Sequence, residues 1–364
     1  MKRQTCEIYQ DLPNYENETH YIYAAVESTR AFFKRPFLDI VEEIRQARKE
    51  GKTKFIFLAT EEALLILSIN KIHRLLAVLG DEVDASQFYY LTSSIDGERA
   101  YNNYCERVNY TGRRISIRSG HAFERKAQFG LRNIDIDTDV EPNISKEKLF
   151  LCFNKVNREH RMWLLDRMLG ENLVEKGYYS FEGEAGWLDT IPNNKFANIR
   201  KNRDIFPLRL NITEHRTNPV DIIQDDIHYH KNSYFSIVTE TIYFDNKYPA
   251  YWHKANVEDS IFFTEKTYRC FALKHPFILL GRPGSLEELK KSGYKTFHPF
   301  ISEDYDKIVD NRERFEFIIN EIKRLCNFTV DEWNVWSTDI KEIVDYNHTH
   351  FFNRKTYDAQ AISK

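Results

Sequence analysis

The sequence predicts an α/β protein built on parallel β-sheets, and three observations carry that prediction. Short, wholly apolar runs recur along the chain, as expected for strands that are covered on both faces. Stretches with helical periodicity separate these runs, which is the pattern of strand–helix–strand units. The alternation begins twice in a chain of 364 residues, a length that suggests about two domains. We therefore expect two Rossmann-like α/β domains.

The first half of the chain contains the strands predicted for one sheet. They lie at residues 21–26, 54–58 (KFIFL), 88–91 (FYYL) and 115–117 (ISI). Amphipathic helices are expected between them, over residues 38–50, about 61–79 and 97–105. The first domain is predicted to span residues 1–140.

The second half repeats the alternation. Strands are predicted at residues 149–153 (LFLCF), 236–241 (SIVTET) and 277–280 (FILL), with a further short strand ending at Phe297. Helices are predicted over residues 158–169, 264–275, 285–293 and about 303–325, and again from residue 330 onward. Residues 182–220 show few clear elements. The second domain is predicted to span residues 148–330, followed by a helical segment at 331–364.

Local signals define two of these helices. Thr264 can cap the first of them, and Pro276 ends it because proline cannot continue the helical hydrogen-bond ladder. Ser285 and Glu288 have the spacing of a capping box for the next helix, which Gly293 ends. A tight turn therefore separates the strand at 277–280 from a short second helix.

Composition excludes several classes of protein. Charged residues make up 29% and hydrophobic residues 42%, which is typical of a globular protein and not of a disordered one. The formal charge of −3 provides no general attraction to nucleic acid or to acidic membranes. Five scattered cysteines without C-x-x-C spacing favour reduced thiols. Neither an apolar leader nor a run long enough to cross a bilayer is present, so a cytoplasmic location without a membrane partner is expected.

A local excess of basic residues lies near the end of the first predicted domain. Residues 113–132 hold seven basic side chains, opposed by Glu124 alone. They are Arg113, Arg114, Arg118, His121, Arg125, Lys126 and Arg132. Such a run is typical of a surface for an anionic acceptor or a donor phosphate, and also of a solvated face, which is the preferred interpretation.

Residues 135–148 (DIDTDVEPNISKEK) are the best candidate for a linker between the two domains, because they are polar and lack periodicity. The segment contains Asp135, Asp137 and Asp139, and carboxylates at such spacing suit Mg²⁺ or Mn²⁺. The triplet does not follow a predicted buried strand, however. A solvated acidic loop is therefore preferred, and no metal site is predicted.

Two segments of the second half place charged side chains at a helix start. One is the T-E-K sequence, in which Glu265 and Lys266 follow the capping Thr264. The other follows the strand LFLCF and carries Lys155, Arg158 and Arg161 in a loop and first helical turn. Backbone N–H groups at a helix start, combined with nearby cations, are suited to binding phosphate.

These segments carry a resemblance to a known family. T-E-K with a following aromatic, then H-P-F-I-L-L-G and P-G-S-L, resembles the donor-site segment of fucosyltransferase-like glycosyltransferases, in particular their viral and marine-bacterial branch. The run F-N-K-x-N-R-x-H-R from Phe153 is similar to the loop that opens the donor domain in that branch. Glu240 matches a glutamate that ends a strand before T-E-K, although the F-E-N-S surroundings of the animal members are missing.

The resemblance implies the GT-B arrangement, in which two Rossmann-like domains face a cleft and the C-terminal helix returns to the first domain. It implies a metal-independent, inverting transfer of a sugar from a nucleoside-diphosphate sugar to a glycan or a small hydroxylated acceptor, without a cofactor. Lys155, Arg158 and Lys266 would stabilise the leaving diphosphate, and Glu265 would hold the ribose. The remaining candidates for donor binding are Asn154, Arg161, Glu240 and Thr264.

The general base is expected at the strand ends of the first domain, and the sequence does not choose among the candidates. They are Glu61 or Glu62 after KFIFL, Asp96 after FYYL and His121 after ISI. Two alternatives to the carbohydrate acceptor stay open. One is transfer to hydroxymethylated bases of viral DNA, gripped by the basic run. The other is a nucleotide-sugar-binding protein without turnover.

Overall fold

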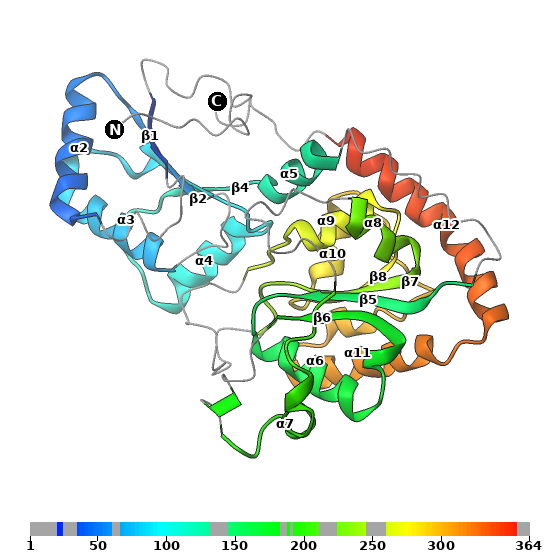
Figure 1. Ribbon diagram of the computed structural model, residues 1–364. Helices are drawn as coiled ribbons and strands as arrows, with labels where there is room; N and C mark the ends of the chain where they lie inside the picture. The colour runs from blue at the N-terminus through cyan, green and yellow to red at the C-terminus, as the bar shows by residue number, and fades with distance from the viewer. Residues whose placement is uncertain are drawn as a thin grey trace. The chain divides into compact units, whose positions relative to one another are not determined.

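The computed structural model describes residues 20–24, 35–59, 66–131, 145–182, 188–189, 192–210, 224–244 and 260–354 (Figure 1). The chain divides into two compact units. The first unit comprises residues 1–125, 255–262 and 355–364, and the second comprises residues 126–254 and 263–354. Each unit combines a parallel sheet with helices, so the predicted α/β class is confirmed.

The sheet of the first unit contains four described strands in chain order, all parallel: β1 (His20–Ala24), β2 (Lys54–Ala59), β3 (Phe88–Thr92) and β4 (Ser116–Ser119). The crossovers contain α2 (Phe37–Lys49), α3 (Ile66–Leu79) and α4 (Gly97–Arg107), with short 3₁₀ turns η2 (Gly80–Glu82) and η3 (Ala85–Gln87) before β3. Every crossover steps in the same direction along the sheet. Because parallel crossovers are right-handed, the three helices belong on one face.

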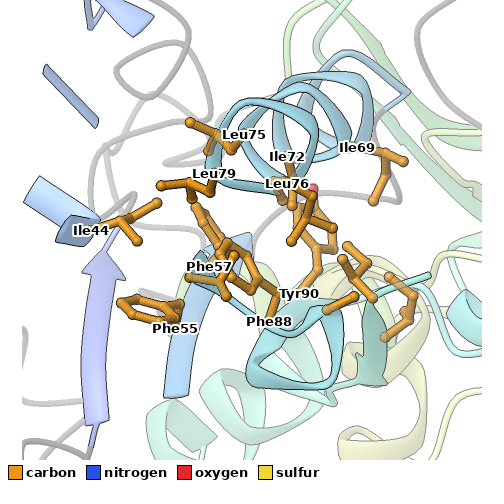
Figure 2. Packing of buried hydrophobic residues seen from close by; sticks show 14 of the residues in the cluster. Ile44, Phe55, Phe57, Ile69, Ile72, Leu75, Leu76, Leu79, Phe88 and Tyr90 are labelled. Carbon is orange, nitrogen blue, oxygen red and sulfur yellow. The ribbon is translucent and has the colours of Figure 1, made fainter. Parts of the chain in front are cut away.

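The apolar core of the first unit lies between that face and the helices, as Figure 2 shows. Phe55 and Phe57 of β2 pack on Phe88 of β3, with ring centroids 5.1 and 5.9 Å apart. Ile72 and Leu76 of α3 join this cluster and are almost completely buried. The alternation of large apolar residues along KFIFL therefore directs Phe55 and Phe57 to the helix-covered face.

The sheet of the second unit is also parallel, with the order β6 (Gly177–Phe181), β5 (Lys148–Asn154), β7 (Ser233–Thr239) and β8 (Phe277–Leu280). Here the chain steps from β5 to β6 in one direction and from β7 to β8 in the other. The strand order therefore reverses between β5 and β7. In open α/β sheets a crevice forms outside the carboxyl ends of the strands at such a switch point, and ligands bind there.

Helices cover both faces of the second sheet. The helices of this unit are α5 (Ala122–Leu131, which crosses the unit boundary), α6 (Glu159–Gly170), α7 (Ala197–Lys201), α8 (Gln224–Lys231), α9 (Glu265–Ala272), α10 (Ser285–Lys291), α11 (Asn311–Cys326) and α12 (Val330–Asn353). Short 3₁₀ turns are η4 (Val174–Lys176), η6 (Arg203–Ile205) and η7 (Asp304–Lys307). In Figure 1, α6 and α11 lie on one side of the sheet and α9 and α12 on the other. The first pair meets through Trp163 and Phe315, and the second through Tyr268 and Phe351.

Two predicted local features are absent. The short strand ending at Phe297 does not form, because the backbone N–H of Phe297 donates to the Glu303 carboxylate instead of to a neighbouring strand. The capping box at Ser285 is also wrong. Gly284 precedes α10 with a left-handed φ of 81°, and the Asp306 carboxylate accepts from the N–H groups of Leu286 and Glu287. An acidic side chain distant in sequence has replaced the local cap.

The C-terminal helix is part of the second unit. Residues 330–353 form one continuous helix, α12, that belongs to the second unit. It packs on α9, and the ring of His348 contacts the carbonyl oxygen of Ala272 at 2.8 Å. His350 lies against Gly293, whose φ of 91° and lack of a side chain allow that approach. These contacts of α12 are thus with the second unit, while residues 355–364 are assigned to the first.

Several elements were not predicted. They are β6, α5, α7 and α8. Conversely, the predicted linker up to residue 144 lies outside the described residues, as do the first turn of the helix predicted from residue 61 and Arg132. No helix in the described part of the chain is long and apolar enough to cross a membrane.

Candidate functional site

The N-terminus of α9 is built around a buried carboxylate. Glu240 follows directly after β7 and is 1% exposed. One carboxylate oxygen accepts from the Thr264 N–H at 3.0 Å and the Thr267 hydroxyl at 2.6 Å. The other accepts from the Thr264 hydroxyl at 2.8 Å and from the Thr241 N–H at 3.2 Å. Glu240 therefore fixes the first turn of α9 to the end of β7.

The predicted cap of this helix is confirmed. Thr264 has an extended backbone, and its hydroxyl oxygen accepts from the Lys266 N–H. The Lys266 ammonium lies 3.1 Å from the same oxygen and 3.1 Å from a Glu265 carboxylate oxygen. The side chains of Glu265 and Lys266 are 18% and 26% exposed. Both are held in place by the helix start while part of each side chain stays accessible.

The N-terminus of α6, the helix that follows β5, also contacts the carboxyl end of β7. The ring Nε2 of His160 donates to the backbone oxygen of Glu240 at 2.9 Å. The Arg161 guanidinium donates to the oxygen of Thr239 at 3.0 Å and to that of Val156 at 3.1 Å. Two helix starts, those of α6 and α9, therefore converge on the carboxyl end of β7.

The charges at this place do not cancel. Burial and, to a smaller extent, the neighbouring Arg158 lower the pKa of the Arg161 guanidinium to about 10 against the opposing effect of Glu240. Burial also raises the pKa of the Glu265 carboxyl, but Lys266 and Arg269 outweigh it and leave that pKa below its ordinary value. Four cations thus share the site with two carboxylates. They are Arg158, Arg161, Lys266 and Arg269, against Glu240 and Glu265.

The structure separates the donor-site candidates into two groups. Asn154 is fully buried, accepts from the Thr239 hydroxyl at 2.6 Å and joins β5 to β7. With Arg161 and Glu240 it holds the strand ends and helix starts in place. Lys155 and Arg158 lie in the loop before α6, where Lys155 is exposed and Arg158 half-buried. With Glu265 and Lys266 they form the accessible group.

Three residues of the site were not identified from the sequence. His160 and Thr267 make the contacts just described, and Arg269 interacts electrostatically with Glu265. Arg269 follows Glu265 by four residues, the spacing at which an acid and a base meet on one helix face. That signal was present in the sequence. The contacts of His160 and Thr267 with Glu240 span 80 and 27 residues of sequence, so no local pattern predicts them.

Two of the candidates for a general base, Asp96 and His121, are described by the structure, and both lie at the carboxyl edge of the first sheet. Asp96 follows β3, and its side chain is 5% exposed. Its carboxylate accepts from the Ile261 N–H at 2.7 Å and pairs with Arg99. Burial raises the pKa of this carboxyl against those contacts. Glu61 and Glu62 lie outside the described residues.

His121 is the other described candidate. It follows β4 and precedes α5, with a side chain that is 21% exposed. The ring Nδ1 lies 3.2 Å from a carboxylate oxygen of Glu124, which is completely buried. The backbone around it is pinned, because the Gly120 N–H donates to the oxygen of Thr92 and the Arg125 N–H to the oxygen of His121.

The basic run at residues 113–132 is largely occupied by contacts within the chain. The Arg113 guanidinium donates to three backbone oxygens, that of Leu76 in the last turn of α3 and those of Gly80 and Val83 just after it. Arg114 donates to the side-chain oxygen of Asn102, and Lys126 is buried. These contacts favour the interpretation of the run as part of the fold over a surface for an anionic partner.

No group of three or more histidine, cysteine or acidic side chains within the described residues is arranged to hold a metal ion. Asp135, Asp137 and Asp139 fall outside them. No protein-family model matches this chain, and no curated protein matches it.

Proposed function

We propose that this protein is a glycosyltransferase that moves a sugar from a nucleoside-diphosphate sugar to an acceptor hydroxyl with inversion and without a required metal. The observation that carries the proposal is the convergence of two helix N-termini and four cations at the switch point of the second sheet. Helix starts and cations together are suited to a diphosphate, and open α/β sheets bind nucleotides at such a point.

The accessible side chains have the chemistry that this reaction needs. Negative charge grows on the diphosphate as the bond to the anomeric carbon breaks, and Lys155, Arg158 and Lys266 would stabilise it. The Glu265 carboxylate can accept from both ribose hydroxyls, since its lowered pKa keeps it ionised. Asn154, Arg161 and Glu240 act indirectly by keeping these groups in position.

The acceptor is proposed to be a glycan or another small hydroxylated molecule. Proteins that grip a DNA duplex place several cations on phosphates, and the structure uses Arg113 and Arg114 within the fold. The GT-B arrangement of the two units is part of the same proposal and rests on the resemblance of the T-E-K and F-N-K segments to fucosyltransferase-like enzymes.

The proposal is tested by incubating the protein with a panel of nucleotide sugars and hydroxylated acceptors, and by weighing the products by mass spectrometry. Transfer or hydrolysis of one nucleotide sugar supports an enzyme. Calorimetric binding of a nucleoside diphosphate without any turnover would replace it with the binding-protein alternative, and absence of both would refute the proposed site.

Variants at the two ends of α6 connect the activity to the site. Arg158→Ala should weaken nucleoside-diphosphate binding, because this side chain lies at the helix start. Arg167→Ala serves as the matched control, since Arg167 lies in the last turn and pairs with Glu171 and Glu316. Equal effects of both changes would contradict the proposed location.

Metal independence is tested separately. Turnover should persist in excess EDTA, and Asp137→Ala should leave it unchanged, because the cations at the helix starts supply the charge. Loss of turnover under both conditions would indicate a metal held by the acidic segment.

A further inference from the structure

We propose that His121 is the general base of the reaction and that Glu124 positions its ring, an inference that rests on the proposed glycosyl transfer. The sequence left four candidates for this role, of which the structure describes two, Asp96 and His121. They lie at the carboxyl ends of neighbouring parallel strands, β3 and β4. Their surroundings differ in the properties that a base needs.

Asp96 is committed to the fold. Its carboxylate accepts a backbone N–H from Ile261, in a segment where the Ser94 hydroxyl also meets that of Ser260 at 2.9 Å. The Ile95 N–H completes this attachment by donating to the oxygen of Ile261. An acceptor hydroxyl could approach Asp96 only by displacing these contacts or Arg99. Asp96 therefore holds the returning segment at residues 260–262.

His121 has the opposite arrangement. Part of its side chain is accessible, while the carboxylate beside Nδ1 is completely buried and cannot itself contact an acceptor. A carboxylate beside Nδ1 favours the ring form that carries its hydrogen there, which leaves Nε2 with the lone pair.

The ring is also held in place. Phe123, in the first turn of α5, packs edge-on against Phe262 with ring centroids 5.5 Å apart. The Gly120 N–H ties the preceding residue to the end of β3. His121 therefore sits between two anchored neighbours, as a group that must meet a reacting atom requires.

The proposed step balances as follows. The acceptor oxygen forms a bond to the anomeric carbon while its proton passes to His121 Nε2. The bond between the anomeric carbon and the diphosphate oxygen breaks, and its electron pair leaves with the diphosphate. The imidazolium beside Glu124 then releases the proton to water, which restores the neutral ring.

The first test compares kcat and KM of His121→Gln with those of His298→Gln, the same change at an exposed histidine of the second unit. General-base catalysis contributes about 10²- to 10⁴-fold, so kcat of the first variant should fall by that order with little change in KM for the nucleotide sugar. His298→Gln should behave as wild type. Wild-type kcat in a folded His121→Gln protein would overturn the inference while leaving the transferase proposal intact.

The second test separates chemistry from packing. Imidazole added to His121→Ala should restore part of kcat, which a purely structural histidine would not allow. In full-length protein labelled with ¹⁵N at histidine, the His121 shifts should report a hydrogen on Nδ1, and Glu124→Gln should shift that tautomer balance and lower kcat. Unchanged shifts, or no rescue by imidazole, would contradict the assigned roles. Absence of transfer in the wild type would refute the transferase proposal and this inference with it.

Discussion

Two arginine-rich segments, one in each unit, show that similar sequence patterns can take different places in the fold. In the first unit Arg113 donates to three backbone oxygens in and just after the last turn of α3. In the second unit Arg158 is the N-cap residue of α6, where the backbone N–H groups of the first turn have no acceptor within the helix. The position of each arginine in the fold therefore decides which backbone groups it lies beside.

The two sheets differ in the order of their strands. In the first, the described strands follow chain order, so they contain no switch point. In the second, the order reverses between β5 and β7, and both helix starts meet there. The topology thus explains why the donor-site candidates gather on the second unit, whereas the carboxyl edge of the first sheet offers the His121–Glu124 pair.

We expect the largest effect on stability from removing the buried carboxylate of Glu240, which holds the start of α9. Glu240→Ala leaves the Thr264 N–H and the hydroxyls of Thr264 and Thr267 without their acceptor. We expect a loss of roughly 3–5 kcal/mol in the free energy of unfolding. Glu240→Gln, which keeps one acceptor oxygen, should lose less. Urea unfolding of both variants measures this, and equal midpoints for Glu240→Ala and wild type would show that the helix start is held otherwise.

The next prediction tests the structural role of the first-unit arginine. Arg113→Ala removes charged donors from three backbone oxygens and should destabilise the first unit by about 2–3 kcal/mol. Arg114→Ala, which removes an exposed contact with Asn102, should stay within about 0.5 kcal/mol of wild type. Hydrogen exchange at the β2 and β3 amides measures the stability of the first unit. Comparable effects of the two changes would erase the contrast with Arg158.

The third prediction concerns ligand binding. Lys266→Ala should weaken the binding of a nucleoside diphosphate by on the order of 1.5–3 kcal/mol, because it removes a charge-assisted contact at the start of α9. Lys291→Ala, at the end of α10 and paired with Glu288, is the control. Isothermal calorimetry decides the matter, and an unchanged affinity in folded Lys266→Ala would remove this residue from the site.

The smallest effect concerns acid stability, where the two units should behave alike. Burial lowers the pKa of His73 in the first unit and of His275 in the second to about 4. Between that value and the ordinary pKa of 6.5 the unfolded chain binds more protons, so stability falls as pH decreases. Each histidine should contribute about 1–2 kcal/mol of loss between pH 7 and pH 5.

Variants assign this loss to its unit. His73→Gln should flatten the pH dependence of hydrogen exchange in β2 and β3, and His275→Gln that in β7 and β8. His298→Gln, at an exposed position, should leave both slopes as they are. Slopes that survive both buried changes would show that other groups control acid stability.

Local signals in the sequence were sufficient for most elements and for the helix start at Thr264. Short apolar runs such as KFIFL and FILL form strands, as expected for segments covered on both faces. Thr264 caps α9 because its hydroxyl accepts from the Lys266 N–H two residues later. The capping box at Ser285 was wrong for the converse reason. Asp306, 20 residues away, already accepts those N–H groups.

The sequence by itself determined which residue types stand at each strand end and helix start, since periodicity and capping act over a few residues. Only the tertiary structure decided their use. It buried Glu240 as an acceptor for α9, turned Arg113 toward the carbonyls of α3 and placed Glu124 beside His121. The physical reason is that a charge in a folded chain is defined by its partners and by its access to water, and the strand order sets both.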